Sequence, residues 1–145
     1  MPKPAIDFLT FRLDVLSEQA KLRVSRDYES TYQVTLRELR VLRLAYAQPG
    51  ITQSGVVESS YLEKTLVSKL TTSLVQRQLI RREIGQEDAR LVHLYLTDKG
   101  KAIVEGCNAI GRQIEKEWLA TIDLQDLAVF ERVLAQLTAN CVEMA

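Results

Sequence analysis

The feature that most constrains this chain is a change in the spacing of its apolar residues at Leu79. Before that point apolar residues recur every three or four positions, whereas in the segments 79–84 and 91–96 the spacing changes to the alternating type. The first spacing places side chains on one face of a helix, and the second places them on one face of a strand. In the second segment Val92, Leu94 and Leu96 share one face. We therefore predict a β-hairpin with a polar tip at residues 85–90, directly after helices.

Two helices joined by a tight turn are predicted immediately before this hairpin. The pattern favours a short helix over about 52–59 and a longer one over about Glu63–Gln78. Ser60–Glu63 also has the spacing of a capping box, so a start three residues earlier stays open for the longer helix. A preceding helix begins with the capping box Thr35–Glu38 and ends at the Gln-Pro-Gly of residues 48–50. Together these segments predict a winged helix-turn-helix.

Long amphipathic helices are predicted at both ends of the chain. They cover Pro4–Arg26, Asp98–Ile122 and Leu124–Glu143, with Thr97 and Asp123 as N-caps of the last two. The core of one 145-residue chain is too small to cover three such apolar stripes, which favours dimerisation through the termini. The alternative is a three-helix bundle formed within one chain.

The expected fold class is mainly α with a small β-hairpin wing (α+β). We divide it into an N-terminal dimerisation helix (residues 1–34), a winged helix-turn-helix (35–100) and C-terminal dimerisation helices (101–145), which together form one continuous domain. The net charge is zero, but residues 61–101 carry eight basic and five acidic side chains, whereas residues 102–145 carry three and seven. This distribution suits a central segment that contacts an anion.

Other classes of protein have little support in the sequence. No run of roughly 18 apolar residues suggests a membrane span, and the N-terminus lacks a signal-peptide pattern, so we expect a soluble, cytoplasmic protein. Cys107 and Cys141 have no partners at metal-ligand spacing, and both are expected to be buried apolar residues. His93, the only histidine, has no catalytic partner at motif spacing and is expected to be structural. We predict no enzyme activity, no metal site and no cofactor.

Three short segments, taken in order, resemble the MarR family of bacterial transcription regulators. They are Leu79–Arg82, Glu87–Arg90 and Leu94–Gly100, which look like the family's wing signature: an aliphatic pair with arginine, then Asp-x-Arg, then Leu-Thr-x-x-Gly. The resemblance extends over essentially the whole chain. The chain departs from the family at Gln78, where a glycine is common at the end of the recognition helix, and at Gly55, which lies inside the short helix.

The resemblance implies a homodimer that binds double-stranded DNA, as a repressor on a palindromic operator. In the longer helix Leu66, Leu70 and Leu74 are expected to face the core, with Val67 beside them. The outward residues Thr65, Ser68, Lys69 and Thr72 are then assigned to base or phosphate contacts. Arg90 is assigned to the minor groove with Asp88 orienting it, and phosphate contacts are assigned to Arg81, Arg82 and Gln53 with its neighbour Thr52. The alternatives are a solvated polar helix face and a purely structural ion pair in the hairpin.

Many MarR relatives release DNA when a small aromatic or anionic compound binds between the dimerisation and DNA-binding parts. The residues assigned to such a cleft are Arg12, Leu16, Tyr46 and Trp118. Two other functions stay open. One is a winged-helix protein-interaction module that has lost DNA binding, which the zero net charge favours; the other is a redox switch acting through Cys107 or Cys141.

Overall fold

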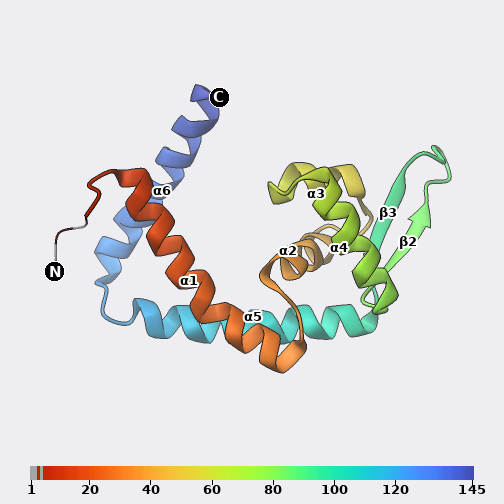
Figure 1. Cartoon of the computed structure of the whole chain (residues 1–145), viewed down its shortest axis with the longest axis horizontal. Coiled ribbons are helices and arrows are strands. Elements are labelled where there is room, and N and C mark those ends of the chain that lie inside the picture. Colours follow the sequence, from red (N-terminus) through yellow and green to blue (C-terminus); the bar gives the residue numbers. More distant parts are fainter. Residues whose placement is uncertain (1–2, 4) are drawn as a thin grey trace. The chain divides into compact units, whose positions relative to one another are not determined.

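The structure is a computed structural model that describes residue 3 and residues 5–145. It contains two compact units, one reaching to Gly111 and one comprising Arg112–Ala145. The first unit holds α1 (Leu9–Tyr32), α2 (Leu36–Ala47), β1 (Ile51–Thr52), α3 (Gln53–Ser60), α4 (Lys64–Gln76), β2 (Ile80–Ile84) and β3 (Val92–Leu96). α5 (Asp98–Leu119) begins in the first unit and ends in the second, where α6 (Leu124–Met144) follows it (Figure 1). The predicted helix-turn-helix and hairpin are therefore both present.

Local capping signals fix most helix starts. Thr35, Thr97 and Asp123 each accept a hydrogen bond from a backbone N–H two or three residues later, at 3.1, 3.0 and 2.8 Å. The alternative start for α4 at the second capping box is wrong. The Ser60 hydroxyl accepts instead from the N–H of Leu62 within the turn, and α4 begins only after that turn.

The hairpin belongs to a three-stranded antiparallel sheet with the order β1-β3-β2. β2 and β3 pair from Ile80 opposite Leu96 to Ile84 opposite Val92, as the alternation predicts. The strand that the sequence did not reveal is β1, where Ile51 lies opposite Leu94. Two residues are too few to show an alternating pattern, so this strand is defined by its partner rather than by its own sequence.

The hydrophobic core of the first unit lies where α2, α4 and the sheet meet. Its fully buried side chains include Leu39, Leu42, Val56, Val67, Leu74, Leu79, Ile80, Leu94 and Val104. The predicted buried ladder of α4 is partly wrong. Val67, Thr71 and Leu74 are fully buried, whereas Leu66 and Leu70 are only half-buried at its flanks. The prediction chose the leucines as the buried row because they are the largest apolar side chains. In the structure the central buried row is Val67, Thr71 and Leu74, at the spacing i, i+4, i+7.

α1 begins at Leu9, later than predicted, and extends beyond its predicted end; Pro4, the predicted start, lies outside the described residues. The helix continues past Arg26 to Tyr32. Tyr28 is buried, and the hydroxyl of Tyr32 lies so close to Gly106 of α5 that a Cβ there would collide with it. These contacts join segments far apart in the chain, so the local pattern did not predict them.

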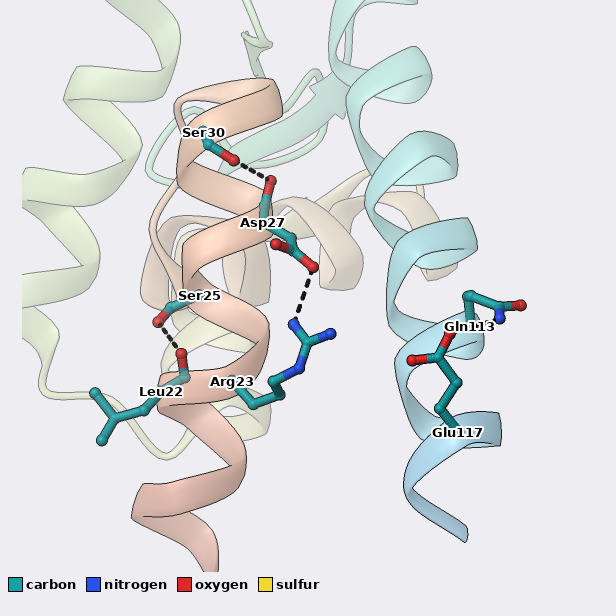
Figure 2. A network of polar contacts seen from close by, with 7 residues as sticks. All are labelled: Leu22, Arg23, Ser25, Asp27, Ser30, Gln113 and Glu117. Carbon is teal, nitrogen blue, oxygen red and sulfur yellow. Dashed lines mark hydrogen bonds and ion pairs between the residues drawn. The ribbon is translucent and has the colours of Figure 1, made fainter. Parts of the chain in front are cut away.

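The surface of α1 includes a polar stretch toward its C-terminal half. The Arg23 guanidinium donates to the Asp27 carboxylate at 3.1 Å, and the Ser25 and Ser30 hydroxyls donate to carbonyls one turn earlier (Figure 2). On the part of α5 that belongs to the second unit, Gln113 donates to the carboxylate four residues later at 2.8 Å. Such exposed pairs contribute little to stability.

Two exposed apolar surfaces remain on the terminal helices. The α1 apolar patch comprises Phe8, Leu9, Phe11, Leu13, Val15, Leu16 and Leu22. α6 is described along its whole length and has no buried residue. The α6 apolar face comprises Leu124, Val129, Phe130, Val133, Leu134, Val142 and Met144. Among the described residues, no helix has both the length and the apolar character that crossing a membrane requires.

Candidate nucleic-acid interface

α4 presents one buried row and one exposed polar face. Thr65, Ser68, Lys69 and Thr72 are all exposed, as predicted, while the core row packs on the opposite side. Across residue 3 and residues 5–145, the Lys69 ammonium has no carboxylate within ion-pair distance. The face therefore offers hydroxyl groups and a free cation to solvent. These are the side chains that reach base edges and phosphates when a helix enters the major groove.

The two arginines of β2 lie on opposite faces of the strand. The Arg82 guanidinium donates to the Thr72 hydroxyl at 3.0 Å and so joins β2 to the exposed face of α4. Arg81 forms an ion pair with Glu83, and its guanidinium lies 4.5 Å from the ring centroid of Tyr95, its cross-strand partner. The structure thus places only Arg82 beside the predicted recognition helix.

Arg81 lines a small pocket instead. The pocket has a volume of about 140 Å³ and is lined by Ala45, Tyr46, Pro49, Arg81, Tyr95, Leu96 and Lys101. The Tyr46 hydroxyl donates to the Glu105 carboxylate at 3.1 Å. Of the residues assigned to an effector cleft, only Tyr46 lines this pocket. Arg12 and Leu16 are exposed on α1, and Trp118 is exposed in the second unit.

The tip of the wing holds a cation in a fixed orientation. The Asp88 carboxylate accepts from Nε and Nη2 of Arg90 at 3.0 and 3.1 Å, and from its backbone N–H at 3.0 Å. The side chain of Arg90 is nevertheless 91% exposed. These hydrogen bonds hold the pKa of the Asp88 carboxyl below its ordinary value and raise the pKa of Arg90. The pair therefore stays charged and presents the guanidinium outward.

The ends of α3 and α4 are held by polar contacts. Gln53 is half-buried as the first residue of α3, where the Thr52 hydroxyl accepts from the N–H of Gly55 at 3.0 Å. At the other end of the motif Gln78 has a φ of 59°, the left-handed conformation for which the family's glycine is suited. Sequence reasoning missed Arg77, which donates to the Glu38 carboxylate at 2.7 Å and to the carbonyl of Gln33 at 2.8 Å. No local motif signals such contacts across the sequence.

The cysteines and the histidine differ in their surroundings. Cys107 is buried as predicted, and burial raises the pKa of its thiol. Cys141 is exposed, so the prediction that it is buried is wrong, and no residue of α6 is buried. His93 Nδ1 lies 2.8 Å from the carbonyl oxygen of Gly50, which ties β3 to the segment before β1. This contact gives the histidine a structural role.

Comparison with known proteins identifies the fold. Residues 34–92 match the sequence model of the MarR family, while a comparison with curated protein sequences found no match. A Staphylococcus aureus MepR–DNA complex is 19% identical, with a TM-score of 0.81, 92% of this chain covered and 96% of that chain. PcaV of Streptomyces coelicolor, solved with its natural ligand, is 21% identical, with a TM-score of 0.79 and coverage of 96% and 98%.

The wild-type MarR of E. coli, solved without ligand, is 24% identical with a TM-score of 0.75, and the alignment covers 91% of this chain and 98% of that one. At these identities the solved structures establish the fold, and the sequence match establishes the relationship over the helix-turn-helix and the wing. Residues 34–92 of the chain therefore match the MarR family, and the chain shares the fold of solved MarR-family regulators.

Proposed function

We propose that this protein is a transcription regulator that binds double-stranded DNA as a homodimer. The observation that carries the proposal is that one unit exposes both the polar face of α4 and the oriented guanidinium of Arg90. Neither group is folded into the core. The similar MepR was solved as a DNA complex, which supports the same use of this surface here.

The geometry of a winged helix assigns a role to each part of this surface. α4 enters the major groove, where Thr65, Ser68 and Lys69 contact base edges or phosphates. Arg90 enters the adjacent minor groove, whose negative potential attracts a guanidinium. Asp88 orients it through two side-chain hydrogen bonds before DNA arrives. Arg82 contacts phosphate beside Thr72, and Gln53 contacts phosphate from the start of α3.

The exposed apolar surfaces of the terminal helices support a homodimer. The α1 apolar patch and the α6 apolar face together expose fourteen large apolar side chains, and exposed apolar surfaces mark protein interfaces. A two-fold dimer presents two copies of α4 and of the wing, which match an operator with two-fold symmetry. In this proposal residues 1–34 and 101–145 form the dimer, and residues 35–100 bind DNA.

We further propose that the protein represses transcription and that a small aromatic or anionic effector releases it from DNA. PcaV was solved with its natural ligand, which supports a ligand-controlled regulator. The candidate contacts remain Arg12, Leu16, Tyr46 and Trp118. An effector acts only if its affinity differs between the DNA-binding state and another state. Operator affinity measured with and without benzoate-type compounds tests this part of the proposal, and an unchanged affinity for every compound contradicts it.

Selection from a pool of randomised DNA duplexes tests DNA recognition directly. We expect the wild-type protein to enrich a palindromic sequence whose half-sites lie about one helical turn apart. Binding to the enriched duplex is then measured across a salt series, with a scrambled duplex of equal length as the control. Equal affinity for both duplexes, seen only at low salt, contradicts the proposal and favours a protein-interaction module. Loss of function in Cys107→Ser or Cys141→Ser would instead favour the redox switch.

A further inference from the structure

We propose that the hydroxyl of Tyr61 donates a hydrogen bond to a backbone phosphate of the operator. This inference rests on the proposed function and adds a contact that neither the sequence analysis nor the wing geometry assigns. Tyr61 occupies the turn between α3 and α4, where it is the C-cap residue of α3. Its side chain is 89% exposed, the highest fraction among the large apolar and aromatic side chains of the described residues.

The backbone of this turn places Tyr61 in an unfavourable conformation. Its φ of 57° and ψ of 27° lie in the left-handed region, which glycine and asparagine adopt readily and bulky residues rarely do. A tyrosine at this position costs folding stability and, within the described chain, gains no hydrogen bond or ring contact in return. Strained residues that persist without a local benefit are candidates for a functional role.

Contacts on either side hold the turn so that the phenol projects outward. Arg40 of α2 donates to the carbonyl of Ser60 at 3.1 Å, and the Ser60 side chain is buried. The Ser60 hydroxyl accepts from the N–H of Leu62 at 3.2 Å. Because the residues before and after Tyr61 are both fixed to the core unit, the orientation of its Cα–Cβ bond is fixed as well. The phenol is therefore attached at a fixed point of the turn rather than on a loose loop.

The position of the turn indicates what the phenol meets. In a helix-turn-helix the first residues of the second helix lie in the major groove. Tyr61 lies in the connecting turn, three residues before Lys64 at the start of α4, so we expect it to face the sugar-phosphate backbone at the edge of that groove. Lys64 and Thr65, which follow the turn, are exposed at the start of α4. Exposed Glu63 adjoins the same turn and repels phosphate, whereas the phenol of Tyr61 is uncharged and can donate a hydrogen bond to it. Tyrosine is one of the side chains that contact DNA phosphates.

The conservative variant Tyr61→Phe tests the proposal, because it removes the hydroxyl and keeps the ring. The probe is the duplex enriched by the wild-type protein. We expect Tyr61→Phe to bind it about tenfold more weakly for each protomer, and so about a hundredfold more weakly as a dimer, as for loss of a hydrogen bond to a charged group in each half-site. The slope of affinity against salt should stay unchanged, because no charge is removed. Arg90→Ala, measured in parallel, should reduce that slope.

Phosphate-ethylation interference separates a DNA contact from a structural effect. We expect one backbone phosphate in each half-site to interfere with wild-type binding and not with binding of Tyr61→Phe, while the other positions are unchanged. Tyr61→Gly should also bind weakly although its melting temperature rises, since glycine relieves the left-handed strain. If Tyr61 only stabilised the fold, Tyr61→Gly would lower the melting temperature instead.

Two outcomes distinguish the failure of this inference from the failure of the proposed function. If Tyr61→Phe binds the duplex as tightly as wild type, with the full interference pattern, while Arg90→Ala weakens binding, the role of Tyr61 is overturned and the DNA-binding function stands. If the wild-type protein enriches no duplex at all, both are overturned together.

Discussion

Arg90 combines almost complete exposure with an orientation fixed by Asp88, as expected for a side chain that contacts DNA. We expect Arg90→Ala to weaken operator binding and to reduce the salt slope by about one for each protomer, because each protomer loses one positive charge at the DNA surface. Folding stability should stay unchanged, since the pair with Asp88 is exposed. Fluorescence anisotropy across a salt series measures both the affinity and the slope.

A matched control removes a cation from elsewhere in the chain. Lys116 is exposed on the part of α5 that belongs to the second unit. Lys116→Ala should leave affinity and salt slope at their wild-type values. Equal behaviour of Arg90→Ala and Lys116→Ala would show that the wing tip makes no contact and that the hairpin ion pair is structural.

Cys107 gives a pH dependence with a defined sign. Burial raises the pKa of its thiol, an effect that the charge of Arg43 partly offsets, so the folded protein keeps this proton to higher pH than the unfolded chain, whose thiol titrates near the ordinary value of 9.0. The stability contribution is therefore complete below that pH and is lost as pH rises through the folded pKa. We expect the free energy of unfolding to fall more steeply above pH 9 in wild type than in Cys107→Ala. Urea unfolding between about pH 7.5 and 10 tests this, and identical slopes contradict it.

At the level of residues, the sequence predicted which side chains are exposed better than it predicted which side chains contact one another. The outward set on α4 follows from helical periodicity, and all four members are exposed. The same periodicity did not distinguish Thr71 from its leucine neighbours, so the buried row was misplaced. Arg81 and Arg82 looked equivalent in sequence, but strand alternation sends one to Tyr95 and the other to Thr72. The DNA roles of all these residues remain predictions.

At the level of elements, the hydrogen bond from Arg82 to Thr72 makes the wing and α4 one assembly. If Arg82 positions Thr72, Arg82→Lys keeps the charge but loses the planar fork that reaches the hydroxyl. We expect this variant to keep the wild-type salt slope and to lose discrimination at one base pair of each half-site. A double-mutant cycle with Thr72→Val should show a coupling energy of about 0.5–3 kcal/mol in operator binding. Additive effects would mean that Arg82 only contacts phosphate.

The end of α4 offers a prediction about stability alone. Gln78 has the left-handed conformation, which costs a non-glycine residue about 1 kcal/mol. Gln78→Gly should therefore raise the free energy of unfolding by up to about 1 kcal/mol. The matched control Gln76→Gly changes the same residue type at the last residue of α4, which is not left-handed, and should not raise it. Chemical denaturation measures both, and a loss of stability in Gln78→Gly would contradict the interpretation.

Elements with local signals were predicted from the sequence, and those defined by distant partners were not. Three N-caps and the hairpin register follow from residues close together in the chain. β1 exists because Ile51 pairs with Leu94, and α1 continues to Tyr32 because of contacts with α5. The pattern of apolar residues within one helix or strand does not predict contacts with Leu94 or with α5, which lie far away in the sequence.

The whole molecule carries more apolar surface than one chain covers. The α1 apolar patch and the α6 apolar face are exposed, and no residue of α6 is buried. A sequence with long apolar stripes at both ends predicts either a bundle within one chain or a dimer. The exposure of α6 favours the dimer, because an isolated chain with these surfaces would tend to associate.

A charge placed on the α6 apolar face tests whether dimerisation and operator binding are coupled. Leu134→Glu introduces a carboxylate that a dimer interface would have to desolvate, so we expect sedimentation to show monomers where wild type is dimeric. A dimer that contacts both half-sites at once binds far more tightly than a monomer that contacts one. The variant should therefore lose operator affinity by about two orders of magnitude or more, while its circular dichroism spectrum still shows helix. Gln136→Glu adds the same charge at a polar exposed position of α6 and should remain dimeric. A monomeric Leu134→Glu that binds the operator as tightly as wild type would show that each protomer recognises DNA alone.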